Sequence, residues 1–137
     1  MDKLFLDSDL IIDVLAERPG FYDSAATLLS LAEKNRIKCF TSPIVIANIY
    51  YVISKVRSKD FAKRSVSKLK NYVEITNVDQ KIIDLALESN FSDLKDAIQY
   101  YCALEIGADI LVTRNKKDYS SSKIPVLSPR EYLDQKI

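Results

Sequence analysis

The chain has 137 residues, of which 47% are hydrophobic and 28% charged, and this balance predicts one globular domain over residues 1–137. It contains no histidine and only two glycines, which excludes an imidazole acid–base pair, a His-ligated zinc site and a glycine-rich phosphate loop. The formal net charge of +1 predicts that any contact with nucleic acid comes from a local basic patch.

The N-terminal half alternates strand and helix patterns. Short apolar runs predict strands, and apolar residues at helical spacing predict helices. Asp7 or Ser8 can cap the first helix, and Pro19-Gly20 ends it. In chain order we predict a strand at 3–6, helices at 8–15 and 21–35, a strand at 38–41 and a helix at 43–55. The last helix is apolar on almost every side, which predicts a central position.

The C-terminal half continues the alternation. Gly107 follows a predicted helix in the position of a glycine C-cap. The elements are helices at 59–71, 80–89 and 93–106, strands at 73–76, 109–113 and 124–127, and a closing helix from Ser128-Pro129. Short apolar strands that alternate with helices predict an α/β fold, with a central parallel β-sheet of 4–5 short strands flanked by helices on both faces.

Carboxylates follow the predicted strands at the edge where such a sheet binds ligands. Asp7 ends the first strand, and Thr113 begins a polar stretch that reaches Asp118. Asp93 and Asp96 lie in the first turn of the helix that leads to the same strand. Each acid also has a local explanation as a helix cap or a turn residue. Because the carboxyl ends of parallel strands share one edge, we expect these acids to converge.

Converging carboxylates need a cation. Two of them about 4 Å apart repel by roughly 4 kcal/mol at an effective dielectric constant near 20. Oxygen ligands without His or Cys favour Mg²⁺ or Mn²⁺, which can activate a water and polarise a phosphate oxygen. The sequence therefore predicts phosphodiester hydrolysis without histidine. Asn48 interrupts an apolar helix, so its amide either satisfies backbone groups or faces this site.

Four segments of the chain resemble the PIN-domain family, which includes the VapC-type toxins of toxin–antitoxin pairs. They are residues 5–13, 42–51, 93–100 and 107–119, and the last is similar to the family's T-R-N-x-x-D-[FY] signature. Residues 124–129 match the family's tail, so the similarity covers nearly the whole chain. The resemblance implies a PIN-like fold and an acidic metal pocket that cleaves RNA.

The resemblance also assigns roles by position. The implied metal ligands are Asp7, Asp96, Asn115 and Asp118, and the implied catalytic set is Asp7, Asp96, Asn115 and Thr113. Asn48, Asp93 and Asp9 are expected to contact these ligands rather than the metal itself. Arg114, Lys116 and Lys117 lie beside the predicted site and are expected to bind the RNA phosphate. The family further implies an antitoxin protein as partner and a homodimer.

One position departs from the family pattern. Asn48 stands where many PIN nucleases have Glu, and the missing charge should weaken metal binding. A catalytically weakened PIN-like module that binds RNA or protein is therefore one alternative. A haloacid-dehalogenase-like phosphatase is another, because Asp7-Ser8-Asp9 follows an apolar strand, although Leu10-Ile11 replaces the usual Gly-Thr. The basic residues between Lys55 and Lys70 predict either a solvated helix face or a track for RNA.

The expected location is cytoplasmic. No stretch of the sequence reaches the run of about 20 apolar residues that a membrane helix needs. Met1 leads almost directly into a strand, without a basic leader and a long apolar segment. Cys39 and Cys102 lie in apolar segments without metal-ligand spacing, as expected for a reduced compartment.

Overall fold

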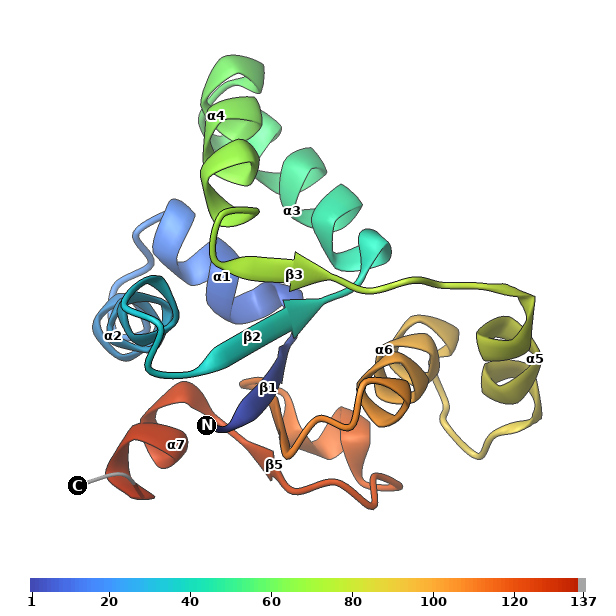
Figure 1. Ribbon diagram of the computed structural model, residues 1–137. Helices are drawn as coiled ribbons and strands as arrows, with labels where there is room; N and C mark the ends of the chain where they lie inside the picture. Colours follow the sequence, from blue (N-terminus) through green and yellow to red (C-terminus); the bar gives the residue numbers. More distant parts are fainter. Residues whose placement is uncertain (136–137) are drawn as a thin grey trace.

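A parallel five-stranded sheet forms the centre of the computed structural model, which describes residues 1–135 (Figure 1). The strand order is β3-β2-β1-β4-β5, and each neighbouring pair is parallel. The strands are β1 (Lys3–Leu6), β2 (Lys38–Thr41), β3 (Val73–Ile75), β4 (Ile110–Val112) and β5 (Val126–Leu127). The predicted α/β class and parallel sheet are confirmed.

The direction in which strands are added reverses at β1. The chain first builds β2 and β3 on one side of β1, and later adds β4 and β5 on the other side. Leu4 of β1 accordingly lies opposite Cys39 of β2 and Ile110 of β4. In open α/β sheets such a reversal leaves a crevice at the carboxyl ends of the strands.

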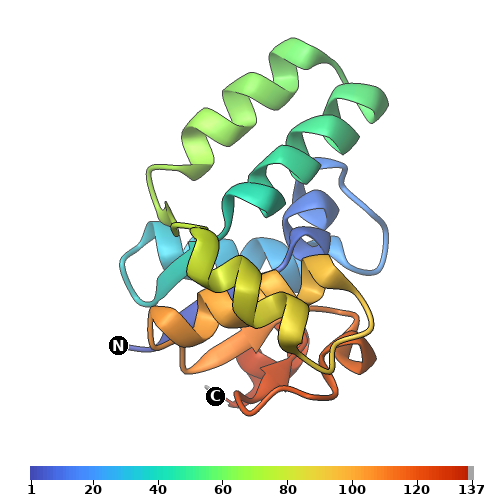
Figure 2. The same cartoon turned by 90° about the vertical axis from the view of Figure 1, so that its right-hand side faces the viewer.

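Helices cover both faces of the sheet, as Figures 1 and 2 show. Successive residues of β1 point to opposite faces, so Leu4 and Leu6 belong to one buried cluster and Phe5 to the other. The first face carries α1 (Ser8–Leu15), α2 (Tyr22–Glu33), α3 (Pro43–Val56), α4 (Lys59–Leu69) and α7 (Pro129–Gln135). The second carries α5 (Gln80–Glu88) and α6 (Leu94–Glu105).

Local sequence explains where several helices begin and end. The hydroxyl oxygen of Ser42 accepts a hydrogen bond from the Val45 amide, and Pro43 occupies the first turn of α3. Gly107 follows α6 with a φ of +68°, a conformation that favours glycine. The predicted glycine cap of this helix is therefore confirmed.

The expectation that residues 43–55 form a central helix is wrong. Only Val45, Ile49 and Ile53 of α3 are buried, whereas Tyr51 is 61% exposed. With α4, α3 forms a hairpin that projects beyond the sheet in both ribbon views (Figures 1 and 2). A helix that is apolar on every side does not show in its sequence which side will pack against other elements. In the part of the chain that the structure describes, no helix has the length and apolar character to cross a membrane.

Candidate functional site

The polar residues that follow β1 and β4 lie side by side. Leu6 pairs with Val112 in the sheet, and the Asp7 amide donates to the Val112 carbonyl at 3.0 Å. Asp7 and Thr113 therefore occupy equivalent positions at the carboxyl ends of two neighbouring strands. This is the point at which the strand order reverses.

Asp7 is held by donors on both carboxylate oxygens. It is only 6% exposed, and its Oδ1 accepts from the Ser8 amide at 2.8 Å, which caps α1. Its Oδ2 accepts from the Thr113 hydroxyl at 3.0 Å and from the Tyr119 hydroxyl at 3.1 Å. The local explanation as a helix cap and a position in the crevice are thus both true of this residue.

Asp96 contacts the same tyrosine from α6. It lies in the first turn of α6, where its amide donates to Oδ1 of the capping residue Asp93 at 3.2 Å. The Tyr119 hydroxyl lies 3.4 Å from Asp96 Oδ1 and 3.1 Å from Asp7 Oδ2. A hydroxyl has one proton, so at any moment it can donate to only one of the two carboxylates.

The electrostatics of the crevice reflect this crowding of acids. Burial, and then the charges of Asp7, Asp93 and Asp118, raise the pKa of Asp96 to about 6. Burial also raises the pKa of the Tyr119 hydroxyl, with Asp7 and Asp96 as further causes, so the phenol stays a neutral donor. Several acids therefore lie close together here, and Lys95 offsets only part of their effect on Asp96.

Asp9 adds a third carboxylate beside Asp7. Its Oδ2 accepts from the Arg114 amide at 2.8 Å and the Asn115 side-chain amide at 3.4 Å. It also lies 3.0 Å from the Thr113 hydroxyl, whose single proton can go to Asp9 or to Asp7 but not to both at once. Its Oδ1 is buried and has no hydrogen-bond partner within residues 1–135. Burial, and then the charge of Asp7, raise the pKa of Asp9. This buried carboxylate oxygen is therefore an acceptor without a donor among the described residues.

The remaining predicted residues surround this cluster unevenly. The Asn48 side-chain amide donates to the Ser8 hydroxyl at 3.1 Å, so Asn48 contacts the start of α1 rather than a backbone group. Asn115 and Asp118 are exposed on the segment after β4. Asp118 belongs to a short 3₁₀ helix, η1 (Lys116–Tyr119), which the sequence pattern did not predict.

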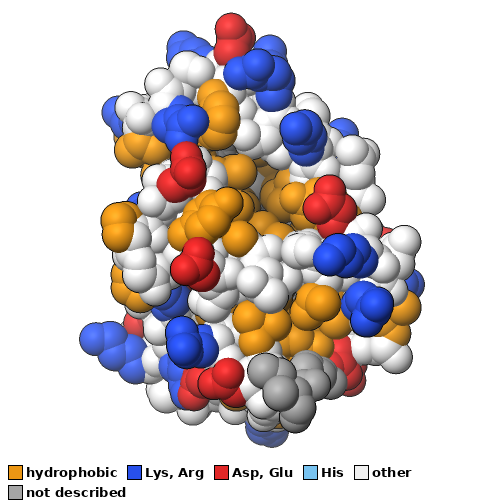
Figure 3. Space-filling view, turned by 90° about the vertical axis from the view of Figure 1, so that its left-hand side faces the viewer, with side chains coloured by type: hydrophobic (Ala, Val, Ile, Leu, Met, Phe, Trp, Pro, Cys, Tyr) orange, Lys and Arg blue, Asp and Glu red, His pale blue; other side chains and the backbone are white. Residues whose placement is uncertain are grey.

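Two of the three predicted phosphate-binding cations already have partners. The Arg114 guanidinium pairs with Asp13, with Nε 2.7 Å from Oδ2, and Lys116 Nζ lies 2.9 Å from a Glu131 carboxylate oxygen. Lys117 is exposed and forms no salt bridge in the described part of the chain. The basic stretch from Lys55 to Lys70 belongs to the projecting hairpin, and Figure 3 shows Lys and Arg side chains spread over that upper part of the molecule.

Sequence reasoning missed the roles of Tyr119 and Asp13. Tyr119 is the last residue of the signature, where a tyrosine carries a hydroxyl that a phenylalanine lacks. Asp13 follows Asp9 by four positions and so lies on the same side of α1. That spacing could have indicated Asp13, whereas its partner Arg114 could not be inferred from spacing.

The chemistry of these side chains fits a hard divalent cation. Within residues 1–135, no group of three His, Cys, Asp or Glu side chains is arranged to hold a metal ion. Mg²⁺, however, usually keeps several waters and binds one or two carboxylates together with substrate phosphates. Asp7 and Asp96 supply two such carboxylates, and the raised pKa of Asp96 and the unpartnered Asp9 oxygen indicate uncompensated negative charge.

Comparison with known proteins finds a matching family and a relative. The model of the PIN domain family matches residues 3–117. A relative from Aquifex aeolicus strain VF5, named ribonuclease VapC1, is 28% identical over 139 residues, which cover 98% of this chain and 95% of the relative.

Solved structures share the same fold. A Klebsiella pneumoniae toxin–antitoxin complex contains a chain with a TM-score of 0.69 and 24% identity, covering 92% of this chain and 97% of that one. VapBC2 from Rickettsia felis, bound to a DNA fragment from its promoter, gives a TM-score of 0.68 and 21% identity with the same coverage of both chains. The predicted PIN-like fold is therefore confirmed.

Proposed function

The chain belongs to the PIN-domain family, and from this premise we propose that it is an endoribonuclease that depends on Mg²⁺ or Mn²⁺. One observation carries the proposal: the carboxylates of Asp7 and Asp96 meet at a single hydroxyl, that of Tyr119. Acids from separate elements that converge at the switch point of a sheet are suited to hold a cation against a phosphate. The homologue named a ribonuclease supports RNA as the substrate.

In this proposal Asp7 and Asp96 hold the ion, with Asn115 and Asp118 at the exposed side. When bound, such an ion polarises a phosphate oxygen and lowers the pKa of the attacking water. Thr113 and Tyr119 fix the orientation of Asp7 through its Oδ2. Because these donors are supplied by the folded chain, the acids need no rearrangement before RNA binds.

The cations have different roles in the proposed complex. The Lys116–Glu131 pair is exposed on both sides and therefore weak, so a phosphate can replace Glu131. Lys117 is free to bind the RNA backbone as it stands. Arg114 pairs with a fully buried carboxylate, and we propose that it positions the segment Thr113–Asn115 in addition to any contact with phosphate.

A protein partner is also part of the proposal. The structures from K. pneumoniae and R. felis are toxin–antitoxin complexes, which supports an antitoxin as the partner of this chain. The homodimer stays a prediction. The family match removes the support for the phosphatase alternative, which we do not propose.

One observation favours a second candidate, a PIN-like module that binds RNA without cleaving it. Asn48 offers an amide to Ser8 where a glutamate would add a carboxylate, and no group of three potential ligands is present in residues 1–135. Loss of one negative charge lowers the affinity of an oxygen-ligand site for a divalent cation.

Cleavage of single-stranded RNA separates the two candidates. The wild-type protein should cut RNA with Mn²⁺ or Mg²⁺ and fail with a chelator, and Asp96→Asn should lose the metal-dependent activity. Asp84→Asn, which changes an exposed carboxylate on α5, serves as the matched control and should cut like wild type. Metal-dependent cleavage that persists in Asp96→Asn contradicts the site, and RNA binding without cleavage in the wild type supports the module.

A further inference from the structure

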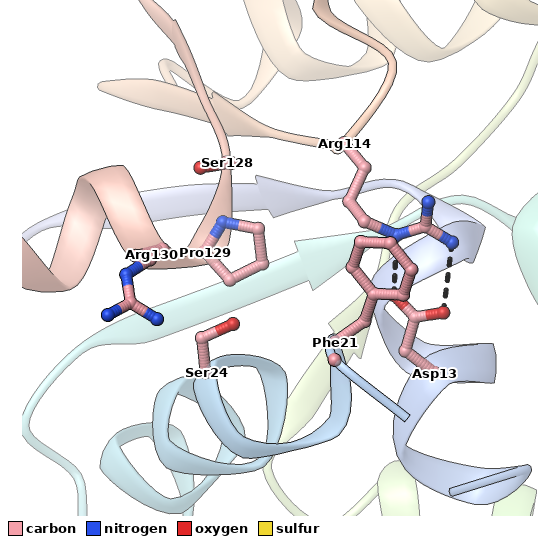
Figure 4. A pocket seen from close by; sticks show the side chains of 8 residues that line it. Asp13, Phe21, Ser24, Arg114, Ser128, Pro129 and Arg130 are labelled. Atoms are coloured by element: carbon pink, nitrogen blue, oxygen red, sulfur yellow. Dashed lines mark hydrogen bonds and ion pairs between the residues drawn. The ribbon is translucent and has the colours of Figure 1, made fainter. Parts of the chain in front are cut away.

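A pocket of about 330 Å³ lies directly beside the acidic crevice. It is lined by Arg114 and Asp13, by residues before and within α2, and by the start of α7 (Figure 4). Arg114 joins the two sites, because its backbone amide donates to Asp9 Oδ2 at 2.8 Å while its side chain lines the pocket. The pocket and the group of acids therefore share one residue, Arg114.

One wall of the pocket is a fixed aromatic ring. Phe21 is 44% exposed, and the Arg114 guanidinium carbon lies 3.9 Å from the centroid of its ring. Arg114 is itself held by two contacts to Asp13, at 2.7 and 3.0 Å, and Asp13 is fully buried. The guanidinium that the ion pair holds thus covers one face of the Phe21 ring, and the ring lines the pocket.

Another part of the lining supplies a second ring and polar groups. In Figure 4 the Pro129 ring lies to the left of Phe21, with Ser24 below it and Arg130 further to the left. Pro129 is buried, whereas Arg130 is exposed and forms no salt bridge in residues 1–135. The pocket is therefore lined by the exposed Phe21 ring, by the Ser24 hydroxyl and by the Arg130 guanidinium, which has no acidic partner in residues 1–135.

This combination matches the chemistry of a nucleobase. A base has two π-faces, which stack on aromatic side chains regardless of sequence, and an edge with hydrogen-bond acceptors that a guanidinium can contact. A bare phosphate would not use the rings, and the charge of Arg114 is already neutralised by Asp13.

We propose that the pocket binds one unpaired nucleobase of the RNA, next to the nucleotide whose phosphate lies in the acidic crevice. The inference deepens the proposed function and rests on it for the identity of the ligand. It assigns Phe21 as the stacking residue and Arg130 as a donor to the edge of the base, and it makes an unpaired base beside the cut a requirement for tight binding.

Fluorescence of a short single-stranded RNA that carries 2-aminopurine, measured in chelator to prevent cleavage, tests the pocket. Wild type should quench the probe at one position, and Phe21→Ala should abolish this quenching and weaken binding about tenfold, the effect of losing one base–aromatic stack. Phe21→Tyr should keep both signals. Tyr22→Ala removes a neighbouring exposed aromatic outside the pocket and should behave as wild type.

Two further measurements keep the test decisive. Ser24→Leu, which fills the pocket and leaves Phe21 in place, should also weaken RNA binding, and it replaces Phe21→Ala if that variant does not fold. An RNA without a base at the quenched position should bind wild type and Phe21→Ala equally. The proposal is overturned if wild type, Phe21→Ala and Ser24→Leu bind RNA equally; the pocket would then be suited to a protein segment. It is also overturned if wild type does not bind RNA.

Cleavage by wild type with Mn²⁺ is scored separately. A protein that cuts RNA with no dependence on Phe21 retains the nuclease function and loses the base pocket. A protein that binds RNA through Phe21 but never cuts it retains the pocket and loses the nuclease function.

Discussion

The guanidinium of Arg114 and the carboxylate of Asp13, separated by 101 positions in the sequence, form a two-point ion pair at 2.7 and 3.0 Å. Asp13 is fully buried on α1, and Arg114 follows directly after Thr113 at the end of β4. The pair therefore ties the segment that carries Thr113 and Asn115 to the helix that begins beside Asp7. It also fixes the guanidinium on which Phe21 stacks.

Arg114→Ala should destabilise the fold strongly. The substitution leaves the buried Asp13 carboxylate with only a 3.5 Å contact to Arg18, and breaking such a pair costs about 3–5 kcal/mol. Urea unfolding near pH 7 measures the loss, and Arg114→Lys should lose less because it retains the charge. Arg130→Ala, an exposed arginine of the same pocket, should stay within about 0.5 kcal/mol of wild type. Equal stability of Arg114→Ala and wild type would contradict a structural role of the pair.

Asp96→Asn should change how stability depends on pH. The folded-state pKa of about 6 lies above the ordinary value of 3.8, so the folded protein binds a proton that the unfolded chain has already lost between these values. The stability that this proton contributes is present below about pH 4 and is lost as the pH rises through about 6. In chelator, the variant should therefore equal wild type near pH 4 and exceed it by about 2 kcal/mol near pH 8.

Urea unfolding at the two pH values measures this difference, with Asp84→Asn as the control that should follow wild type at both. A constant offset between Asp96→Asn and wild type at every pH would show that the charge of Asp96 is not the cause.

Tyr119→Phe should separate a positioning role from a packing role. It removes only the hydroxyl that contacts Asp7 and Asp96, and a hydrogen bond to a charged group contributes about 1.5–3 kcal/mol. Without this donor the charged form of Asp96 is less favoured, so the acid limb of the pH–activity profile should move to higher pH.

The control for this prediction is Tyr100→Phe, a tyrosine of the same buried cluster whose hydroxyl accepts from the Lys123 amide at 3.1 Å. It should lower stability without moving the pH profile. The positioning role is excluded if the two phenylalanine variants have the same profile as wild type.

Mn²⁺ should stabilise the protein against heat through Asp7 and Asp96. A ligand that binds only the folded state at 100 times its Kd stabilises it by about 2.7 kcal/mol. A thermal melt with and without Mn²⁺ measures the effect, and chelator should reverse it. The melting temperatures of Asp7→Asn and Asp96→Asn should not respond, whereas Asp84→Asn should respond like wild type. An equal Mn²⁺ effect in all four proteins would place the ion elsewhere.

The elements and the main acids could be predicted from the sequence because they depend on local patterns. Apolar runs predicted the strands, and capping residues predicted the ends of helices. The carboxylates after β1 and near β4 follow from where a parallel sheet ends its strands. The position of α3 could not be predicted in this way, because its apolar surface does not show which side α1 and α4 cover.

The hydrogen-bond partners within the site also could not be predicted from the sequence. Asn48 bonds to Ser8, and Asp9 shares the Thr113 hydroxyl with Asp7, over separations of 40 to 106 residues. A sequence lists these side chains as donors and acceptors, but many pairings of the same groups satisfy the same chemistry.

The amino-acid sequence alone determined that this protein has no imidazole, that short strands alternate with helices, and that acids follow the strands. The tertiary structure alone decided that the Tyr119 hydroxyl contacts both Asp7 and Asp96 and that Asp13 forms an ion pair with Arg114. The physical reason is the distance along the chain over which each feature is decided. Helix and strand patterns arise between near neighbours in the sequence. Burial and charge in the crevice depend on packing between distant segments, which meet only when the chain folds.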